Sequence, residues 1–260
     1  MYQEERLIGI LQHLEQYQRI NLDTICELFD VSRDTARRDI IKLEEQGSIL
    51  RTRGGAILPT LTNQVANYSD RLRDEATIPS KQAIGRLAAS LLHDGDYLLL
   101  DASTTVQYAA ESIRTQGHVI VTNSIDIADI LNRKEGIDVH LLGGKLHPEH
   151  RLIYGARALD MLKDYHVHKL LLGTCAITPD GLTNPYEEEG YLVREMMRRA
   201  DQVILLADRT KFGRRQFNRI SGLERIDILI TDQEPDEQMK QALYRHEIDI
   251  MIAKGDAPHD

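Results

Sequence analysis

Basic and hydroxyl-bearing side chains recur at short spacing between residues 32 and 56, where they could contact a nucleic acid. Ser32 can cap a helix. Ala36, Ile40 and Leu43 then keep helical spacing, so one face of that helix packs on a core. A helix with arginines on its other face, followed by a basic hairpin with glycine turns, fits the major groove of DNA with a wing beside it. The residues that we expect to contact DNA are Ser32, Arg33, Asp34, Thr35, Arg37, Arg38, Lys42, Arg51 and Arg53.

Small polar residues and glycines follow several short apolar runs in the second part of the chain. In an open parallel sheet, ligands bind beyond the carboxyl ends of the strands, where backbone amides and helix N-termini can hold an anion. Residues 103–105 predict a phosphate cradle, Lys211 could neutralise the anion, and Asp101 and Asp208 could accept hydrogen bonds from ligand hydroxyls. Each loop taken singly also fits a capping or turning role. The expected ligand-binding residues are Asp101, Ser103, Thr104, Thr105, Thr122, Asn123, Ser124, Gly143, Gly144, Asp208 and Lys211.

The elements that would position the basic residues are three short helices and a hairpin. Residues 7–14 and 22–29 show helical periodicity, and a tight turn at residues 30–31 leads into the basic helix. This order predicts a winged helix-turn-helix. A three-helix interaction module with a charged, solvated face is the alternative. Arg51 and Arg53 favour DNA binding, because a basic hairpin suits phosphate contacts better than packing.

Apolar runs of strand length alternate with helical patterns from residue 97 to residue 252. Such alternation implies right-handed crossovers and a mainly parallel sheet that is covered on both faces. The predicted fold class is therefore α/β: an N-terminal winged helix-turn-helix followed by a larger α/β domain with a mainly parallel sheet. The expected strands are 97–100, 119–121, 139–142, 170–172, 203–206, 226–230 and 248–252, and the expected helices are 106–113, 125–131, 158–165, 191–199 and 237–244.

Composition divides the chain into four segments. We expect a DNA-binding domain over residues 1–57 and a polar linker, bounded by prolines, over residues 58–79. An α/β ligand-sensing domain over residues 80–254 would begin with a helix capped by Ser80. Residues 255–260 are expected to form a disordered tail.

The overall charge conceals the basic segment. The chain carries a formal charge of −9, yet residues 33–53 have a balance of +2. The location of charge matters more than its total for nucleic-acid binding. Cys26 and Cys175 lie far apart without the spacing of metal ligands, no charged-then-apolar leader opens the chain, and the apolar runs are too short to cross a bilayer. We therefore expect a cytoplasmic protein with no membrane partner.

Histidines occur in two close pairs, His147 with His150 and His166 with His168. Neither pair has a cysteine or an obvious carboxylate at metal-binding spacing, so surface histidines and no metal site are expected. No Walker A or GxGxxG motif occurs, and we expect no cofactor. The acidic run at residues 187–189 predicts a helix start, because it complements the helix dipole, and it could also contact ligand hydroxyls.

A long set of residues in both halves of the chain follows one pattern. This set resembles the DeoR family of bacterial transcriptional regulators, and the resemblance covers nearly the whole chain. In the N-terminal part its members are Arg6, Ile10, Leu14, Ser32, Thr35, Arg37, Arg38, Asp39, Ile40, Leu43, Gly47, Arg51, Gly54, Gly55 and Ala56. In the C-terminal part they are Ile84, Gly85, Asp94, Gly95, Asp96, Asp101, Thr104, Thr105, Thr122, Asn123, Ser124, Leu142, Gly143, Gly144, Gly155, Gly181, Leu182, Thr183, Ala207, Asp208, Lys211, Phe212 and Gly213.

The resemblance implies a repressor of a carbohydrate operon, whose C-terminal domain is similar to ribose-5-phosphate isomerase and binds a phosphorylated sugar. The partners it implies are a double-stranded DNA operator, the phosphorylated sugar and further copies of the chain, as a dimer or a larger homo-oligomer. Three residues depart from the family pattern: Ala36 replaces the usual isoleucine or valine, Ser103 replaces a glycine, and Val193 stands where a lysine is common. A side chain at residue 103 restricts close approach to the backbone, so the effector or its affinity is expected to differ from the family norm.

Two other functions fit parts of the sequence. A sugar-phosphate isomerase or deaminase-like enzyme with a helical N-terminal extension would use Asp101, Asp208 or Glu189 as a base. A protein-interaction scaffold would not require Arg37 and Arg38. The complete reading helix and wing favour a DNA-binding regulator that is not an enzyme.

Overall fold

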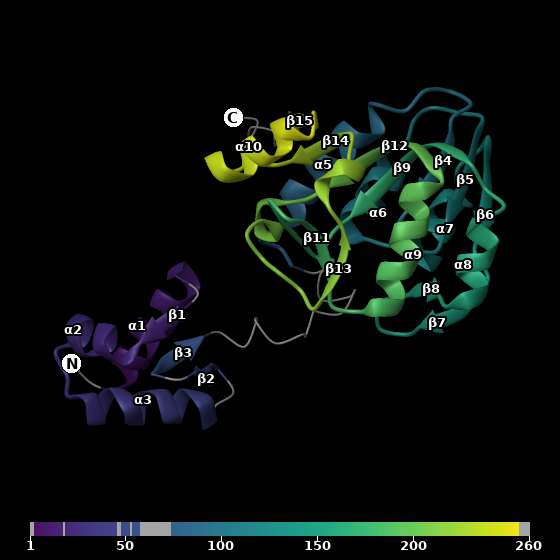
Figure 1. Ribbon diagram of the computed structural model, residues 1–260. Helices are drawn as coiled ribbons and strands as arrows, with labels where there is room; N and C mark the ends of the chain where they lie inside the picture. Colours follow the sequence, from purple (N-terminus) through teal and green to yellow (C-terminus); the bar gives the residue numbers. More distant parts are fainter. Residues whose placement is uncertain (1–2, 18, 46–47, 53, 58–73, 255–260) are drawn as a thin grey trace. The chain divides into compact units, whose positions relative to one another are not determined.

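The computed structural model describes residues 3–17, 19–45, 48–52, 54–57 and 74–254. The chain divides into two compact units, Met1–Gln64 and Val65–Asp260. Each unit is described by itself (Figure 1). The expected linker falls largely on residues 58–73 and the expected tail on residues 255–260, both of which lie outside the described residues.

The described residues of the first unit form three helices and three short strands. Its apolar core contains Ile10, Leu14, Ile25, Ile40 and Leu43, all almost fully buried. The helical spacing that predicted these contacts is confirmed, although Leu28, within the periodic segment 22–29, is 52% exposed. In chain order the elements are α1 Gln3–Tyr17, β1 Arg19–Asn21, α2 Leu22–Phe29, α3 Arg33–Glu45, β2 Leu50–Thr52 and β3 Gly55–Ile57.

Strand β1 is an element that the sequence did not predict. It pairs antiparallel with β3, which pairs in turn with β2, so the wing is a three-stranded sheet of order β1-β3-β2. A Cβ at Gly55 would lie 2.1 Å from the carbonyl oxygen of Ile20, so the close approach of these strands requires glycine at this position. A segment of three residues, such as β1, is too short for alternating apolar and polar side chains to indicate a strand when its pairing partner is unknown.

The second unit is organised around a seven-stranded parallel sheet. Its strand order is β15-β14-β12-β9-β4-β5-β6, and every neighbouring pair is parallel. All seven predicted strands belong to it, so the expected α/β fold is confirmed. The strands are β4 Tyr97–Leu100, β5 His118–Thr122, β6 Ile137–Leu141, β9 Val167–Gly173, β12 Ala200–Leu206, β14 Ile228–Thr231 and β15 Asp249–Ile252.

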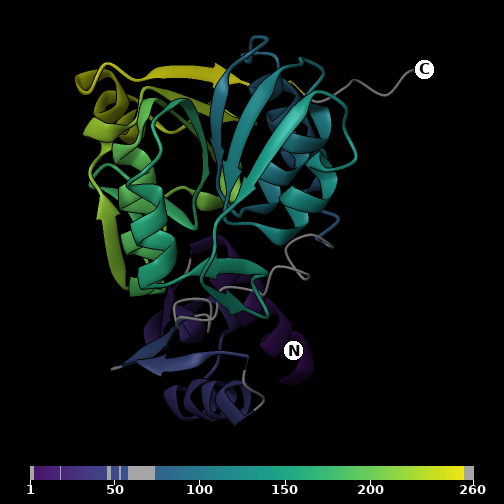
Figure 2. The same cartoon turned by 90° about the vertical axis from the view of Figure 1, so that its right-hand side faces the viewer.

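Helices cover both faces of this sheet (Figures 1 and 2). Leu98 and Leu100 of β4 pack with α5, α6 and α7, whereas Leu99 packs with α8, α9 and α10 on the opposite face. This alternation follows from the two-residue period of a strand. The helices are α5 Ile78–Ala89, α6 Thr104–Ser112, α7 Ile125–Leu131, α8 Ala156–Leu162, α9 Glu187–Arg198 and α10 Glu237–Arg245.

The start of α5 differs from the expectation. The helix begins at Ile78 rather than after a Ser80 cap, and Pro79 lies within its first turn. Proline is tolerated there because the first helical amides have no intrahelical partner. Thr77 precedes the helix and donates a hydrogen bond from Oγ1 to Oδ2 of Asp74, at 2.9 Å.

Two small antiparallel sheets were not predicted, because most of their strands mix polar with apolar residues over three or four positions and show no apolar run. One is a hairpin of β7 Lys145–His147 and β8 Leu152–Tyr154. The other has the order β10-β11-β13, with strands Ala176–Thr178, Gly181–Asn184 and Asn218–Ser221. The described part of this unit also contains two 3-10 turns, η2 Arg209–Lys211 and η3 Leu223–Arg225. No helix in the described residues is long and apolar enough to cross a membrane.

Candidate functional site

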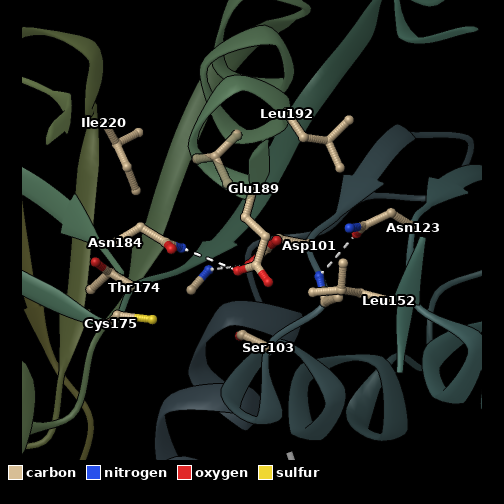
Figure 3. A pocket seen from close by; sticks show the side chains of 13 residues that line it. Asp101, Ser103, Asn123, Leu152, Thr174, Cys175, Asn184, Glu189, Leu192 and Ile220 are labelled. Atoms are coloured by element: carbon tan, nitrogen blue, oxygen red, sulfur yellow. Dashed lines mark hydrogen bonds between the residues drawn. The ribbon is translucent and has the colours of Figure 1, made fainter. Parts of the chain in front are cut away.

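A polar pocket lies at the carboxyl ends of neighbouring strands in the parallel sheet (Figure 3). Asp101 follows β4, Asn123 follows β5, and Gly173 ends β9. Because β5, β4 and β9 are adjacent in the sheet, these loops meet at one edge. Helix α9 and strands β8, β11 and β13 contribute further parts of the wall. The lining residues are Asp101, Ala102, Ser103, Asn123, Leu152, Gly173, Thr174, Cys175, Asn184, Glu189, Leu192, Val193 and Ile220.

Hydrogen bonds between the strand-end loops fix one side of the pocket. The amide of Gly173 donates to Oδ2 of Asp101 at 3.2 Å. The amide of Ala102 donates to Oδ1 of Asn123 at 3.1 Å, and Nδ2 of Asn123 donates to the carbonyl of Ile153 at 3.3 Å. Asn123 therefore ties the loop after β4 to the β7–β8 hairpin, and the polar groups are positioned before any ligand binds.

Ser103 combines a helix cap with a close packing contact. Its Oγ accepts a hydrogen bond from the amide of Val106 at 3.1 Å and so caps α6. A Cβ at Gly173 would lie 2.2 Å from Oγ and 2.3 Å from Cβ of Ser103, so the serine side chain occupies the space next to this glycine. Ser103 departs from the family pattern, and its side chain has room because residue 173 is a glycine.

Other predicted ligand-binding residues lie near the pocket but do not line it. Thr104 and Thr105 are buried in the first turn of α6, 4% and 5% exposed. Thr122 is fully buried; its Oγ1 donates to the carbonyl of Leu100 at 2.8 Å and accepts from the amide of Ser124 at 3.1 Å. The Oγ of Ser124 caps α7 by accepting from the amide of Ile127 at 3.2 Å. These three contacts stabilise the strand-end loops.

Gly143, Gly144, Asp208 and Lys211 also lie outside the pocket lining. The amide of Gly143 faces Sδ of Met161 at 3.2 Å, and a Cβ at Gly144 would lie 2.6 Å from the carbonyl oxygen of Tyr154. Asp208 caps η2, and Nζ of Lys211 lies 3.9 Å from its Oδ2. Of the predicted effector residues, the structure thus brings together Asp101, Ser103 and Asn123, and their role in binding stays a prediction.

The pocket also contains residues that the strand-end argument did not find. Nδ2 of Asn184 in β11 donates to Oε2 of Glu189 in α9 at 3.4 Å (Figure 3). Oδ1 of Asn184 accepts from the amide of Tyr186 at 2.7 Å. The acidic run at residues 187–189 was a signal for Glu189, whereas Asn184 lies on a strand too short to predict. Val193, another departure from the family pattern, lies in the pocket wall. The neighbouring Arg194 donates to the carbonyl of Arg219 at 2.9 Å.

The expectation of surface histidines without a carboxylate partner is wrong for one pair. His150 is only 3% exposed, and His147 is half-buried. Glu189 reaches both from α9, forming a cluster whose ligand atoms all lie within 4.8 Å of one another. Residue spacing could not indicate Glu189 as the partner of these histidines, since it lies about forty residues further along the chain. His166 and His168 are exposed as expected, and Nε2 of His166 lies 2.9 Å from Oδ1 of Asp201.

In the first unit, α3 presents an exposed basic face. Arg37, Arg38 and Asp34 are exposed, and the groove beside them is lined by Arg37 of α3 together with Arg51 and Thr52 of the wing. This arrangement of a helix and a basic strand matches a winged helix-turn-helix interface. Arg53 was also predicted to contact DNA but lies outside the described residues.

Several of the other predicted DNA-contacting residues already have partners within the unit. Oγ of Ser32 accepts from the amide of Thr35 at 3.2 Å and caps α3. Arg33 forms two hydrogen bonds with Asp23, at 2.9 and 3.0 Å. Nζ of Lys42 donates to Oε1 of Gln3 at 3.1 Å, and Nε of Arg51 lies 3.7 Å from Oε2 of Glu44. These interactions are on the surface and can be exchanged for phosphate contacts at small cost.

A winged helix-turn-helix followed by an α/β unit with a polar strand-end pocket defines a DNA-binding transcriptional regulator with a sensor domain. Residues 6–62 match the DeoR-like helix-turn-helix domain, and residues 77–233 match the DeoR C terminal sensor domain. The chain belongs to the DeoR family of transcriptional regulators.

Curated relatives are similar along their whole length. The chain is 48% identical to the HTH-type transcriptional repressor GlcR of Bacillus subtilis (strain 168), over 100% of both chains. It is 30% identical to the glycerol-3-phosphate regulon repressor of Escherichia coli (strain K12), over 97% of this chain and 100% of that protein. A solved D-ribose-5-phosphate isomerase in complex with phospho-erythronic acid shares 15% identity, with a TM-score of 0.38 over 51% of this chain and 52% of that one. That structural likeness is too low to carry an argument.

Proposed function

We propose that this protein represses a carbohydrate operon and that a phosphorylated sugar, bound in the strand-end pocket, controls its binding to the operator. The proposal joins two surfaces of the chain: the exposed face of α3 with the wing, and the pocket between the sheet edge and α9. The pocket, where polar groups converge from the ends of β4, β5 and β9 and from β11 and α9, is the observation that carries it.

The DNA half of the proposal rests on the exposed arginines. Arg37 and Arg38 are exposed on α3, and Arg51 lies on the wing beside the same groove. Guanidinium groups can read guanine edges in the major groove and neutralise backbone phosphates. We assign base-edge and phosphate contacts to these three residues and supporting contacts to Ser32, Arg33, Asp34, Thr35 and Lys42.

The sugar half rests on the hydrogen-bonding groups that line the pocket. Asp101 and Glu189 provide carboxylate oxygens, and Asn123 and Asn184 provide amide groups. Carboxylates and amides are suited to a ligand with several hydroxyl groups, because they accept and donate hydrogen bonds in fixed directions. Leu152, Leu192 and Ile220 add apolar surface against which a sugar ring can pack.

The phosphate would bind at the start of α6. Among the described residues that line the pocket, none is lysine, arginine or histidine. Backbone amides and the positive end of the helix dipole can hold an anion without a basic side chain. Ser103 caps this helix, and its Oγ already accepts from one of those amides, that of Val106. We therefore expect a small phosphorylated sugar and an affinity that depends on residue 103.

The names of the relatives support a regulator of sugar use. One relative is a repressor of a glycerol-3-phosphate regulon, a regulon named after a phosphorylated polyol. We propose that two copies of this chain bind a repeated or palindromic operator, since a dimer places two reading helices one helical turn of DNA apart. A repressor acts on chromosomal DNA, and a cytoplasmic location is part of the proposal.

Effector control requires that the ligand bind one arrangement of the protein more tightly than another. A sugar phosphate held between α6 and Glu189 would connect the sheet edge with α9. We propose that this contact favours one placement of the DNA-binding units in the dimer and releases the operator.

Fluorescence anisotropy on the DNA upstream of its own gene tests both halves. We expect binding that weakens between two salt concentrations, because phosphate contacts release counterions. One sugar phosphate from a panel should alter this binding, whereas the matching free sugar should not. DNA binding that no sugar phosphate of the panel alters would overturn the sensor half of the proposal. Turnover of a sugar phosphate by the purified protein, without DNA binding, would support an enzyme instead.

A further inference from the structure

Two histidines and a carboxylate from separate elements converge beside the pocket. His147 ends β7, His150 lies in the turn before β8, and Glu189 lies in the first turn of α9. Each offers one ligand atom, and the three atoms all lie within 4.8 Å of one another. We call these residues the His–His–Glu cluster.

The β7–β8 hairpin holds the two histidines of the cluster, and α9 holds Glu189. The β7–β8 hairpin is anchored by Nε of Arg151, which lies 2.8 Å from Oδ2 of Asp126, and by the amide of Ile153, which donates to the carbonyl of Asn123 at 2.7 Å. His150 is 3% exposed. A site that is fixed in advance loses little conformational entropy when an ion binds.

Aromatic rings enclose the two imidazoles. The ring of Tyr186 lies 5.3 Å from that of His150 and 6.0 Å from that of His147, and the ring of Tyr154 lies 6.0 Å from that of His147. The two imidazole rings are themselves 4.4 Å apart. These ring contacts restrict the orientations of the two imidazoles beside Glu189.

We propose that the His–His–Glu cluster binds a divalent transition-metal ion, with Zn²⁺ as the best chemical match. Two imidazole nitrogens and one carboxylate oxygen form a donor set that zinc uses when a fourth position is left for water or a ligand. Metal–ligand bonds of about 2.0–2.2 Å place donor atoms roughly 3.4 Å apart, so small side-chain rotations close the cluster around the ion. Mg²⁺ and Ca²⁺ fit less well, because they prefer sets composed of oxygen atoms.

Binding of the ion changes one weak hydrogen bond. The amide of His150 donates to Nδ1 of His147 at 3.3 Å, which is long for such a bond. An ion at Nδ1 replaces this contact, whereas an ion at Nε2 moves the ring proton to Nδ1. Either change costs little compared with the metal–nitrogen bond.

A metal-free hydrogen bond between one histidine and Glu189 is the competing explanation. Such a hydrogen bond would explain why one histidine lies beside Glu189. It would not explain why the second histidine lies there as well, whereas a metal site requires all three groups to converge. Glu189 also lines the strand-end pocket and accepts a hydrogen bond from Asn184. The ion therefore joins the hairpin to α9 and fixes the carboxylate that the pocket presents to its ligand.

Metal titration of the full-length protein tests the proposal. Protein treated with a chelator and then freed of it is titrated with Zn²⁺ by calorimetry, and with Co²⁺ by visible absorption, which reports the coordination geometry. We expect one saturable site per chain and a rise of the unfolding temperature with Zn²⁺. The titration uses neither DNA nor sugar, so its outcome is independent of the proposed function.

Variants decide whether the cluster is the site. His147→Ala, His150→Gln and Glu189→Gln should each weaken Zn²⁺ binding by at least about tenfold and abolish the Co²⁺ spectrum. His166→Ala is the matched control, because His166 is an exposed histidine beside a carboxylate and should leave both signals unchanged. His147 and Glu189 are half-buried, so their variants should retain the circular dichroism of the parent and remain decisive if His150→Gln does not fold. Absence of a saturable site, or equal affinity in the parent and in His147→Ala and Glu189→Gln, would overturn the proposal.

Discussion

Asp39 of the reading helix α3 is completely buried and accepts two hydrogen bonds from the guanidinium of Arg6 in α1, at 2.9 and 3.3 Å. Nε2 of Gln3 donates a third hydrogen bond to the same carboxylate, at 2.9 Å. The pair fixes α3 from its inner face, while Arg37 and Arg38 remain exposed on the outer face. The negative charge of Asp39 is thus neutralised by Arg6 inside the fold, away from the predicted DNA contacts.

Removing this carboxylate should destabilise the first unit. Asp39→Ala leaves the buried charge of Arg6 without its partner, and the expected loss is about 3–5 kcal/mol in the free energy of unfolding, measured by urea titration. Asp23→Ala is the control, because the Asp23–Arg33 pair is 65–70% exposed and should contribute less than about 1 kcal/mol. Equal losses in the two variants would show that the buried pair does not hold α3.

The two exposed arginines of α3 should differ in their effect on DNA binding according to what each contacts. Arg37→Ala and Arg38→Ala should each lower operator affinity by about tenfold or more, measured by anisotropy. A phosphate contact also reduces the slope of log affinity against log salt by about one, whereas a base contact relaxes sequence preference. Arg133→Ala, which removes an exposed arginine paired with Asp129 in the second unit, should change neither quantity. Full affinity in both α3 variants would exclude this face as the DNA interface.

Ser103 and Gly173 should be coupled by their close approach. Gly173→Ala places a Cβ about 2.2 Å from Oγ of Ser103, so α6 or the end of β9 must shift. We expect a loss of about 1–3 kcal/mol in stability, as for other overpacked sites, together with a weaker response to the sugar phosphate. Ser103→Gly should cost only a few tenths of a kcal/mol, because glycine is a tolerated N-cap residue. The double variant should recover most of the stability lost by Gly173→Ala, and additive losses in thermal unfolding would contradict the coupling.

Stability should decline in acid through Asp96, which precedes β4. Burial raises the pKa of this carboxyl, but hydrogen bonds from the His93 amide and from Lys169, together with the Lys169 charge, outweigh burial and hold the pKa below its ordinary value. The folded state therefore favours the ionised carboxylate. Its contribution to stability is complete above the unfolded pKa of about 3.9 and is lost as pH falls through the lower folded pKa.

Thermal unfolding of the parent and of Asp96→Asn, followed from neutral pH to about pH 3, measures this contribution. The variant should be less stable at neutral pH, and the difference should shrink in acid. Asp138→Asn is the control, since Asp138 is 73% exposed, and it should follow the parent. A difference between parent and Asp96→Asn that is constant with pH would assign the effect to packing rather than to charge.

Much of the architecture is determined by local sequence. The two-residue alternation of Leu98, Leu99 and Leu100 places neighbouring side chains in the cores on opposite faces of the sheet, and helical spacing places Ala36, Ile40 and Leu43 in the core of the first unit. These periodicities are properties of each element alone. They therefore predicted all seven sheet strands and the reading helix. The family, in contrast, followed from the resemblance of motif residues in both halves of the chain.

Long-range contacts, in contrast, were decided only by the tertiary structure. Strand β4 lies between β5 and β9, and this order selects Asp101, Asn123 and Gly173 as neighbours while leaving Gly143, Gly144 and Lys211 outside the pocket lining. Strand β11, Gly181–Asn184, contains no apolar run, so Asn184 had no local signal. Glu189 approaches His147 and His150 because α9 packs beside β8, and residue spacing along the chain does not encode that distance. The sequence by itself determined which elements form and which polar residues end the strands; the packing of those elements decided which side chains meet.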